Sequence, residues 1–85
     1  MRVVLKLYAS LTDYLPAQGR DQRHAIDVDV PAETTVDAMI ERFHLPRRAC
    51  HLVLVNGVYV APPLRAQKRL AEGDHLAIWP PVAGG

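Results

Sequence analysis

The chain has few of the features that mark disulfide-bonded, metal-binding or membrane-spanning proteins. A single cysteine, Cys50, stands among 85 residues, so no intramolecular disulfide can form, and its spacing from the four histidines matches no zinc site. Lys6 interrupts the apolar start of the chain before a signal-peptide core can build, and no apolar run approaches the ~20 residues that cross a bilayer. We therefore expect a cytoplasmic protein in a reducing compartment, with no bound metal or cofactor and no membrane partner.

The chain also lacks a strong excess of charge of either sign. Ten basic residues against nine acidic ones give a net charge of +1, whereas domains that bind phosphate backbones are usually strongly basic. We therefore expect no nucleic-acid partner. A hydrophobic fraction of 49% suits a folded globular chain, and a chain of this length supports one core, which predicts a single domain over residues 1–85.

Two segments in the first third of the chain alternate between apolar and polar residues, which is typical of half-buried strands. The first strand is expected over Arg2–Ala9, with Tyr8 on the face opposite the inward apolar residues. The second is expected over His24–Val30, with Ile26, Val28 and Val30 inward. The polar residues 10–23 between them predict a loop that follows one helical turn near Leu11–Leu15.

A short amphipathic helix is expected after residue 33. Thr34 or Thr35 can cap its first turn by accepting a hydrogen bond from a backbone N–H, and Pro46 is expected to end it. Its apolar side chains recur at the spacing that places them on one face, which can lie across a sheet. They are Val36, Met39, Ile40 and Phe43.

The second half of the chain predicts a hairpin and a last strand. Asn56-Gly57 suits the positive φ angles of a two-residue type I′ turn between strands at 51–55 and 58–61. An irregular connection over 62–69 and a tight turn at 72–74 lead to a strand at 75–79, with Trp79 on the outward face. Pro80 and Pro81 cannot donate ladder hydrogen bonds and therefore end the sheet. The order ββαβββ predicts an α+β fold, a mixed sheet packed against one helix.

The C-terminal segment, residues 80–85, is predicted to be a tail that carries the chemistry. Pro80 and Pro81 stiffen its base, whereas Gly84 and Gly85 have no side chains and can thread a narrow channel. A nucleotide-dependent partner could convert the Gly85 carboxylate to a mixed anhydride, which a sulfur or nitrogen nucleophile could then attack. A Gly-Gly ending would arise by chance in roughly 0.5% of chains, so an acyl carrier is the preferred hypothesis.

Three motifs, in this order and spacing, resemble the MoaD/ThiS family of sulfur carriers, and the resemblance spans nearly the whole chain. The Pro-Pro-Val-x-Gly-Gly ending is most similar to MoaD-type members, the small subunits of molybdopterin synthase, also called molybdopterin converting factor subunit 1. The resemblance implies a ubiquitin-like β-grasp fold. The motifs are Leu54-Val55-Asn56-Gly57, Leu70-Ala71-Glu72-Gly73-Asp74 and Pro80-Pro81-Val82-Ala83-Gly84-Gly85.

The resemblance also implies a reaction sequence and its partners. An E1-like adenylyltransferase of the MoeB/ThiF type would use ATP to adenylate Gly85, with Gly84 as the slender residue that allows threading. A sulfurtransferase would supply sulfur to form a thiocarboxylate. A large molybdopterin synthase subunit of the MoaE type, or another acceptor enzyme, would consume it for molybdopterin (molybdenum cofactor) biosynthesis. The chain alone would be a non-catalytic carrier.

Two alternatives stay open at this point. The loop over 17–24, the stretch over 45–51 and Pro62-Pro63 depart from the molybdopterin-type pattern, so the sulfur could instead serve thiazole, tRNA or another metabolite. Alternatively, the chain is a ubiquitin-like protein modifier or a binding module, in which Gly85 is joined to lysine amines or has no chemical role.

Partner binding is predicted for aromatic residues and for the base of the tail. Large aromatic side chains on an open sheet face favour docking, although packing at the sheet edge would also explain them. The predicted docking residues are Tyr8, Tyr59, Trp79, Pro80, Pro81 and Val82. Cys50 is expected to be a small buried hydrophobic residue rather than a nucleophile. Six basic residues could form a patch for an acidic partner or could simply be solvated: Arg42, Arg47, Arg48, Arg65, Lys68 and Arg69.

Overall fold

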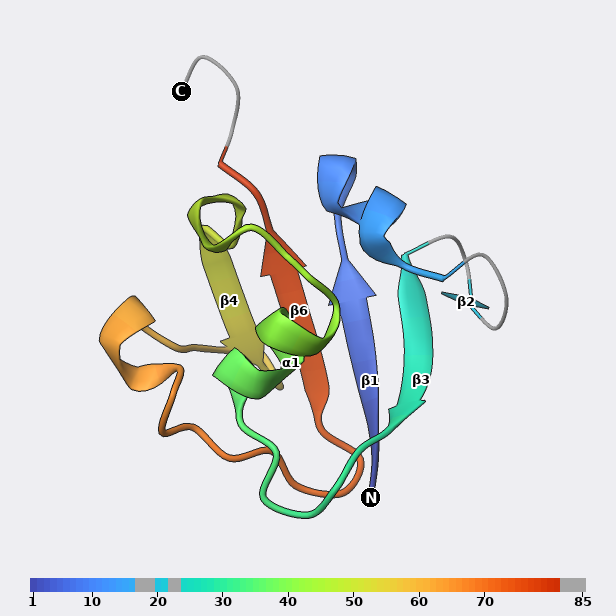
Figure 1. Cartoon of the computed structure of the whole chain (residues 1–85), viewed down its shortest axis with the longest axis vertical. Coiled ribbons are helices and arrows are strands. Elements are labelled where there is room, and N and C mark those ends of the chain that lie inside the picture. Colours follow the sequence, from blue (N-terminus) through green and yellow to red (C-terminus); the bar gives the residue numbers. More distant parts are fainter. Residues whose placement is uncertain (17–19, 22–23, 82–85) are drawn as a thin grey trace.

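The computed structural model describes residues 1–16, 20–21 and 24–81, and a mixed sheet forms its centre. The sheet has six strands in the order β2-β3-β1-β6-β4-β5 (Figure 1). The central pair β1 and β6 runs parallel, and the other neighbours run antiparallel. The strands are β1 (Arg2–Leu7), β2 (Arg20–Asp21), β3 (Ala25–Asp29), β4 (Leu52–Val55), β5 (Val58–Tyr59) and β6 (His75–Trp79).

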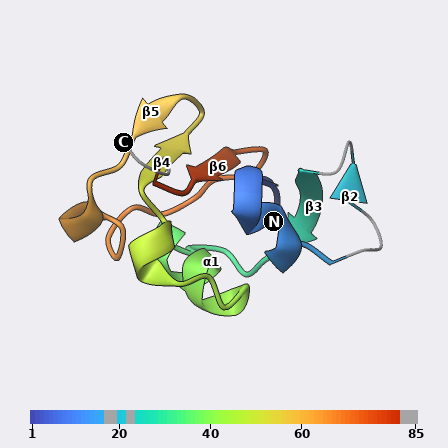
Figure 2. The ribbon, with the colours of Figure 1, turned by 90° about the horizontal axis from the view of Figure 1, so that it is seen from above.

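One α-helix, α1 (Val36–Arg42), lies on a single face of this sheet, and none of the described residues forms a helix on the opposite face (Figure 2). Three short 3-10 helices complete the described elements: η1 (Ala9–Tyr14), η2 (Arg47–Ala49) and η3 (Pro62–Leu64). This arrangement confirms the predicted α+β fold, a mixed sheet against one helix. Among the described residues, no helix is both long and apolar enough to cross a membrane.

The core lies between α1 and the covered face of the sheet. Alternate residues of the central strands are fully buried there, as the sequence pattern predicts. Ile26, opposite Leu5 in the register, is only partly buried at the margin of this core. The largest fully buried side chains are Leu5, Leu7, Leu11, Met39, Ile40, Leu76 and Ile78.

The prediction that residues 10–23 form only a turn followed by a loop is wrong in one respect. Arg20 and Asp21 form the edge strand β2, which pairs antiparallel with Ile26 and Ala25 of β3. Strand β2 contributes only two residues, too few for a period-2 pattern to be detectable in the sequence. The helical turn predicted within this segment is confirmed as η1.

Helix α1 begins as predicted but ends earlier. The Thr35 side chain accepts a hydrogen bond from the Ala38 N–H at 3.1 Å, so Thr35 rather than Thr34 is the cap. The prediction that Pro46 ends the helix is wrong. His44 has a φ of +57°, and the N–H groups of His44 and Leu45 donate to the carbonyls of Glu41 and Ile40, which is a Schellman C-cap.

The hairpin turn and the tight turn before β6 are joined to each other. Asn56 and Gly57 both have positive φ, as a type I′ turn requires. The Asn56 side chain donates to Asp74 Oδ1 at 2.8 Å and accepts from the His75 N–H at 2.9 Å. Asp74 in turn accepts from the Ala71 N–H. These bonds fix the start of β6 against the end of β4.

Candidate functional site

The tail predicted to carry the chemistry begins at the end of β6, and the structure shows how its root is held. The Trp79 carbonyl accepts a hydrogen bond from the His51 N–H at 3.0 Å, the last backbone bond before the prolines. Pro80 is half-buried and Pro81 is exposed. The other predicted tail residues, Val82, Gly84 and Gly85, lie outside the described residues.

The tail root and the bonded turns lie at opposite ends of the strands. Figure 1 shows that β6 ends on the same side of the sheet as η1 and η2, whereas the N-terminus of the chain lies at the other end of the strands. At that other end, the Arg2 carbonyl accepts a hydrogen bond from the Gly73 N–H, and the Arg2 N–H donates to Glu72. The turns of the two motifs other than the tail therefore fix the end of the sheet opposite to the tail root.

Two of the predicted docking residues stack directly on each other beside the tail root. The rings of Tyr8 and Trp79 are nearly parallel, at 2°, with centroids 4.2 Å apart. His24 stacks on the other side of Tyr8, with a centroid distance of 5.0 Å. All three side chains are partly exposed. Because Leu7 and Ile78 point into the core, Tyr8 and Trp79 lie on the open face of the sheet, as the alternation predicts.

Further apolar side chains continue this surface across β4 and β5. Leu52 lies opposite Trp79 in the register and is 38% exposed, and Leu54 lies opposite both Ala77 and Tyr59. Opposite residues of an antiparallel pair project to the same face. The open face therefore carries an apolar surface formed by Tyr8, Trp79, Leu52, Leu54 and Tyr59, which we call the open-face patch.

The open-face patch differs from the sequence-based interpretation in its composition. Tyr59 is 53% exposed and belongs to the face, but it makes no ring contact with Tyr8 or Trp79 among the described residues. Leu52, Leu54 and His24 were not predicted as docking residues. The alternation of Leu52 and Leu54 with buried Val53 and Val55 was the available signal, since it places both leucines outward.

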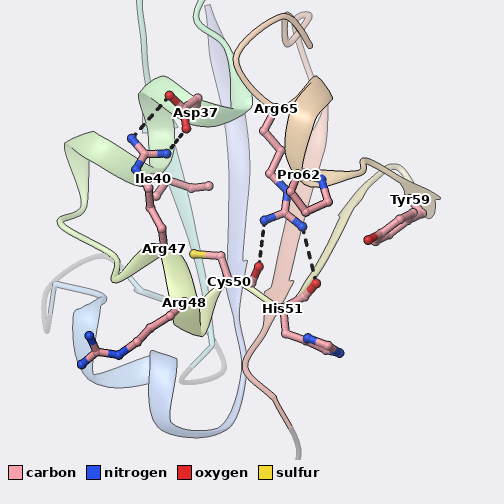
Figure 3. Close-up of a pocket in the computed structure, with 9 residues that line it drawn as sticks. All are labelled: Asp37, Ile40, Arg47, Arg48, Cys50, His51, Tyr59, Pro62 and Arg65. Carbon is pink, nitrogen blue, oxygen red and sulfur yellow. Dashed lines mark hydrogen bonds and ion pairs between the residues drawn. The ribbon is translucent and has the colours of Figure 1, made fainter.

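A second candidate surface surrounds Cys50, which the structure places in the core. Its side chain is only 3% exposed, which confirms the interpretation of Cys50 as a buried hydrophobic residue. Burial raises the pKa of the thiol, and the nearby charges of Arg65 and Arg47 oppose that shift. The thiol is therefore protonated at neutral pH and is a weak nucleophile. Figure 3 shows Cys50 beside Arg47 and Arg65 in a pocket of the surface.

Three of the six residues predicted for a basic patch are ion-paired or buried in the structure. Arg47 bonds to Asp37 and Glu41 on α1, and Arg69 forms an ion pair with Glu33 at 3.3 Å. Arg65 is buried. Among the described residues, no group of three or more His, Cys, Asp or Glu side chains could hold a metal ion.

Comparison with known proteins identifies the family of the chain. The family model described as the ThiS family matches residues 14–85. No curated protein matches the chain.

Solved structures share the fold. A crystal structure of SAMP1 from Haloferax volcanii is 29% identical, with a TM-score of 0.66 and full coverage of both chains. A second structure of this small archaeal modifier protein 1 is 25% identical, with a TM-score of 0.67, covering 95% of this chain and 98% of that one. These likenesses confirm the ubiquitin-like β-grasp fold.

A third structure is the complex of subunits 1 and 2 of the molybdopterin-converting factor from Helicobacter pylori. The matched chain is 14% identical, with a TM-score of 0.59 and full coverage of both chains. At this identity the likeness concerns the fold alone.

Proposed function

Because the chain belongs to the ThiS family, whose ubiquitin-like members are sulfur carriers and modifiers, we propose that it carries sulfur as a thiocarboxylate on Gly85. The observation that supports the proposal is the way in which the base of the tail is anchored. A strand bonded on both sides ends at Trp79, two prolines follow, and the family match runs on to residue 85. A rigid base and a slender tip are what a carboxylate needs to reach a partner's enclosed site.

The proposed chemistry has three steps, all performed by partners on Gly85. A carboxylate oxygen of Gly85 attacks the α-phosphorus of ATP on an E1-like adenylyltransferase, and pyrophosphate leaves. The terminal sulfur of a persulfide on a sulfurtransferase attacks the acyl carbon, and AMP leaves. A thiol then attacks the outer sulfur of the acyl disulfide, which releases the thiocarboxylate and a disulfide. The described residues supply the holding surface rather than the catalytic groups.

The open-face patch supplies that surface in this proposal. Tyr8 and Trp79 are partly exposed, stacked and adjacent to the residue at which the tail begins. Aromatic side chains in a desolvated contact are typical anchors of protein interfaces. A partner that covers this face therefore holds the domain with its tail directed to one side of the contact.

We propose the large subunit of a molybdopterin synthase as the acceptor, as the Pro-Pro-Val-x-Gly-Gly ending suggests. A ThiS-like role in thiazole or tRNA thiolation uses the same carrier chemistry with another acceptor. Protein modification is the second candidate, favoured by the likeness to the archaeal modifier over the full chain. In that case a lysine amine attacks the activated Gly85 carbonyl, and an isopeptide bond replaces the bond to the leaving group.

The first test is the intact mass of the chain after incubation with an E1-like adenylyltransferase, ATP, a persulfide donor and a thiol. The expected result is a gain equal to replacement of one oxygen by sulfur. A chain that lacks Gly85 is the matched control, because it keeps the whole described domain. The same spectrum shows whether Gly85 ends the mature protein. An equal gain in both chains, or a gain in neither, refutes the proposal.

The second test separates the acceptors. The purified thiocarboxylate form is incubated with a large molybdopterin synthase subunit and its pterin precursor, and product formation is followed. Return of the carrier to its carboxylate mass supports the molybdopterin role. Isopeptide-linked adducts of the chain in cell extract, absent for the chain without Gly85, support the modifier role instead.

A further inference from the structure

A pocket of about 370 Å³ opens between α1, η2 and η3, and Tyr59 of the open-face patch is also among its lining residues. Figure 3 shows its two sides: Asp37, Ile40 and Arg47 lie on one, and Arg65 and Pro62 lie on the other. Cys50 and His51 lie between them, just before β4. The pocket is large enough for a small ligand, and its charges indicate which kind.

Arg65 is the unusual group in this pocket. Its side chain is 7% exposed, and it is the one charged residue that is buried among the described residues. The guanidinium donates to three carbonyl oxygens: Nε to Val60 at 3.1 Å, Nη1 to Cys50 at 2.8 Å and Nη2 to His51 at 3.4 Å. A guanidinium has five N–H donors, so two remain without a partner among the described residues.

No carboxylate neutralises this buried charge. The ion pairs of the described residues do not include Arg65. Asp37 lines the same pocket, but both of its oxygens accept from Arg47, which also bonds to Glu41 at 3.2 Å. Arg48 also lines the pocket, is exposed and enters no described ion pair. Arg47 has one positive charge against the two negative charges of Asp37 and Glu41, which leaves −1, and Arg65 and Arg48 add two positive charges. The net charge at the pocket is therefore +1, with Arg65 as its buried member.

Carbonyl dipoles satisfy hydrogen bonds but carry no net charge, so they compensate a buried cation only in part. An anion that enters the pocket would supply the missing counter-charge in a site where water screens the interaction weakly. Planar or tetrahedral oxoanions suit the remaining N–H donors of an arginine. We propose that this pocket binds a small oxoanion, either a phosphate or a carboxylate group, through Arg65, with Arg48 adding charge at the rim.

The site is separate from the Gly85 chemistry, so the inference does not depend on the proposed function. It is nevertheless close to the tail root, because the His51 N–H that lies beside the pocket holds the Trp79 carbonyl. A bound anion would therefore lie next to the segment that leads into the tail.

The test is an NMR titration of the full chain with inorganic phosphate and, separately, with acetate, at ionic strength held constant with chloride. The expected result is a saturable shift of the Arg65 Nε–H signal and of the Cys50 and His51 amide signals. Saturation by phosphate and not acetate, or the reverse, identifies the group. No saturable shift of these signals with either anion up to about 10 mM overturns the proposal.

Variants make the assignment specific. Arg48→Gln should weaken binding about twofold to fivefold, and Arg42→Gln should weaken it less, since Arg42 has the same charge but does not line the pocket. Arg65→Lys keeps the charge but loses the planar fork, and should weaken binding about tenfold. A folded Arg65→Lys variant with unchanged affinity, or equal effects of Arg42→Gln and Arg48→Gln, would show that general surface charge attracts the anion and would refute the proposal.

Discussion

Replacement of Arg65 by methionine should destabilise the domain strongly, independently of any ligand. The guanidinium, which follows η3, donates to the carbonyls of the two residues before β4 and of the residue after β5. Within the part of the chain that the structure describes, no other side chain donates to these three carbonyls. Hydrogen bonds to charged groups contribute about 1.5–3 kcal/mol each, and the 3.4 Å bond to His51 is the weakest of the three. Because methionine fills similar volume, packing loss is small. The pocket lets water reach part of the freed surface, so we expect a loss of about 3 kcal/mol.

The assay is urea unfolding followed by the fluorescence of Trp79, the one tryptophan in the chain. With a urea m-value of about 1–3 kcal/mol/M, a loss of about 3 kcal/mol lowers the urea midpoint by roughly 1–3 M. Arg48→Met is the matched control, because Arg48 is exposed and without an ion pair, and its effect should be about 0.5 kcal/mol or less. If Arg65→Met lies within about 1 kcal/mol of the parent chain, the three carbonyl bonds do not stabilise the fold as argued.

Three further predictions address the helix end, the buried thiol and the open-face patch. His44→Gly should raise the free energy of unfolding by about 0.5–1 kcal/mol, since φ is +57° there, whereas His44→Ala should not. Because burial raises the pKa of Cys50, the thiol contributes a stabilisation that is complete below the ordinary thiol pKa and is lost as pH rises toward the folded-state pKa. The free energy of unfolding, measured with urea at increasing alkaline pH, should therefore fall more steeply for the parent chain than for Cys50→Ala. Tyr8→Ala should weaken binding to the activating partner about tenfold by calorimetry, and Tyr14→Ala, an exposed tyrosine outside the stack, should not.

Most of the sheet could be predicted from the sequence because its signals are local. The bounds of β6 match the expected strand at both ends, and the Asn56-Gly57 turn has the positive φ angles that its residues favour. Alternation also placed Tyr8 and Trp79 on the same open face. Each of these features depends on residues within one strand or one turn, which a pattern of period two or a turn dipeptide can report.

The features that were missed depend on contacts between distant segments. The pairing of β2 with β3 involves only Arg20 and Asp21, whose sequence has no strand pattern. Helix α1 is terminated by His44, two residues after its last residue, because His44 adopts the left-handed conformation. Glycine is the usual residue at such a position, and the sequence has none there, so Pro46 was the nearest helix-terminating signal. The burial of Arg65 could not be predicted because arginine is usually exposed, and its three acceptors come from residues 50, 51 and 60.

The positions of the three sequence motifs explain why the sequence identifies the family more readily than it identifies an acceptor. Two of the three motifs meet at one end of the strands, where Asn56 bonds to Asp74 and His75 and so fixes β4 to β6. A change there should disturb the fold of this chain, whatever its partner. Most of the open-face patch lies outside these two motifs, since Leu54 is its one member that belongs to either of them. Selection for a particular acceptor should therefore act on the open face, and exchange of its residues, rather than of the turns, should redirect the carrier to another partner.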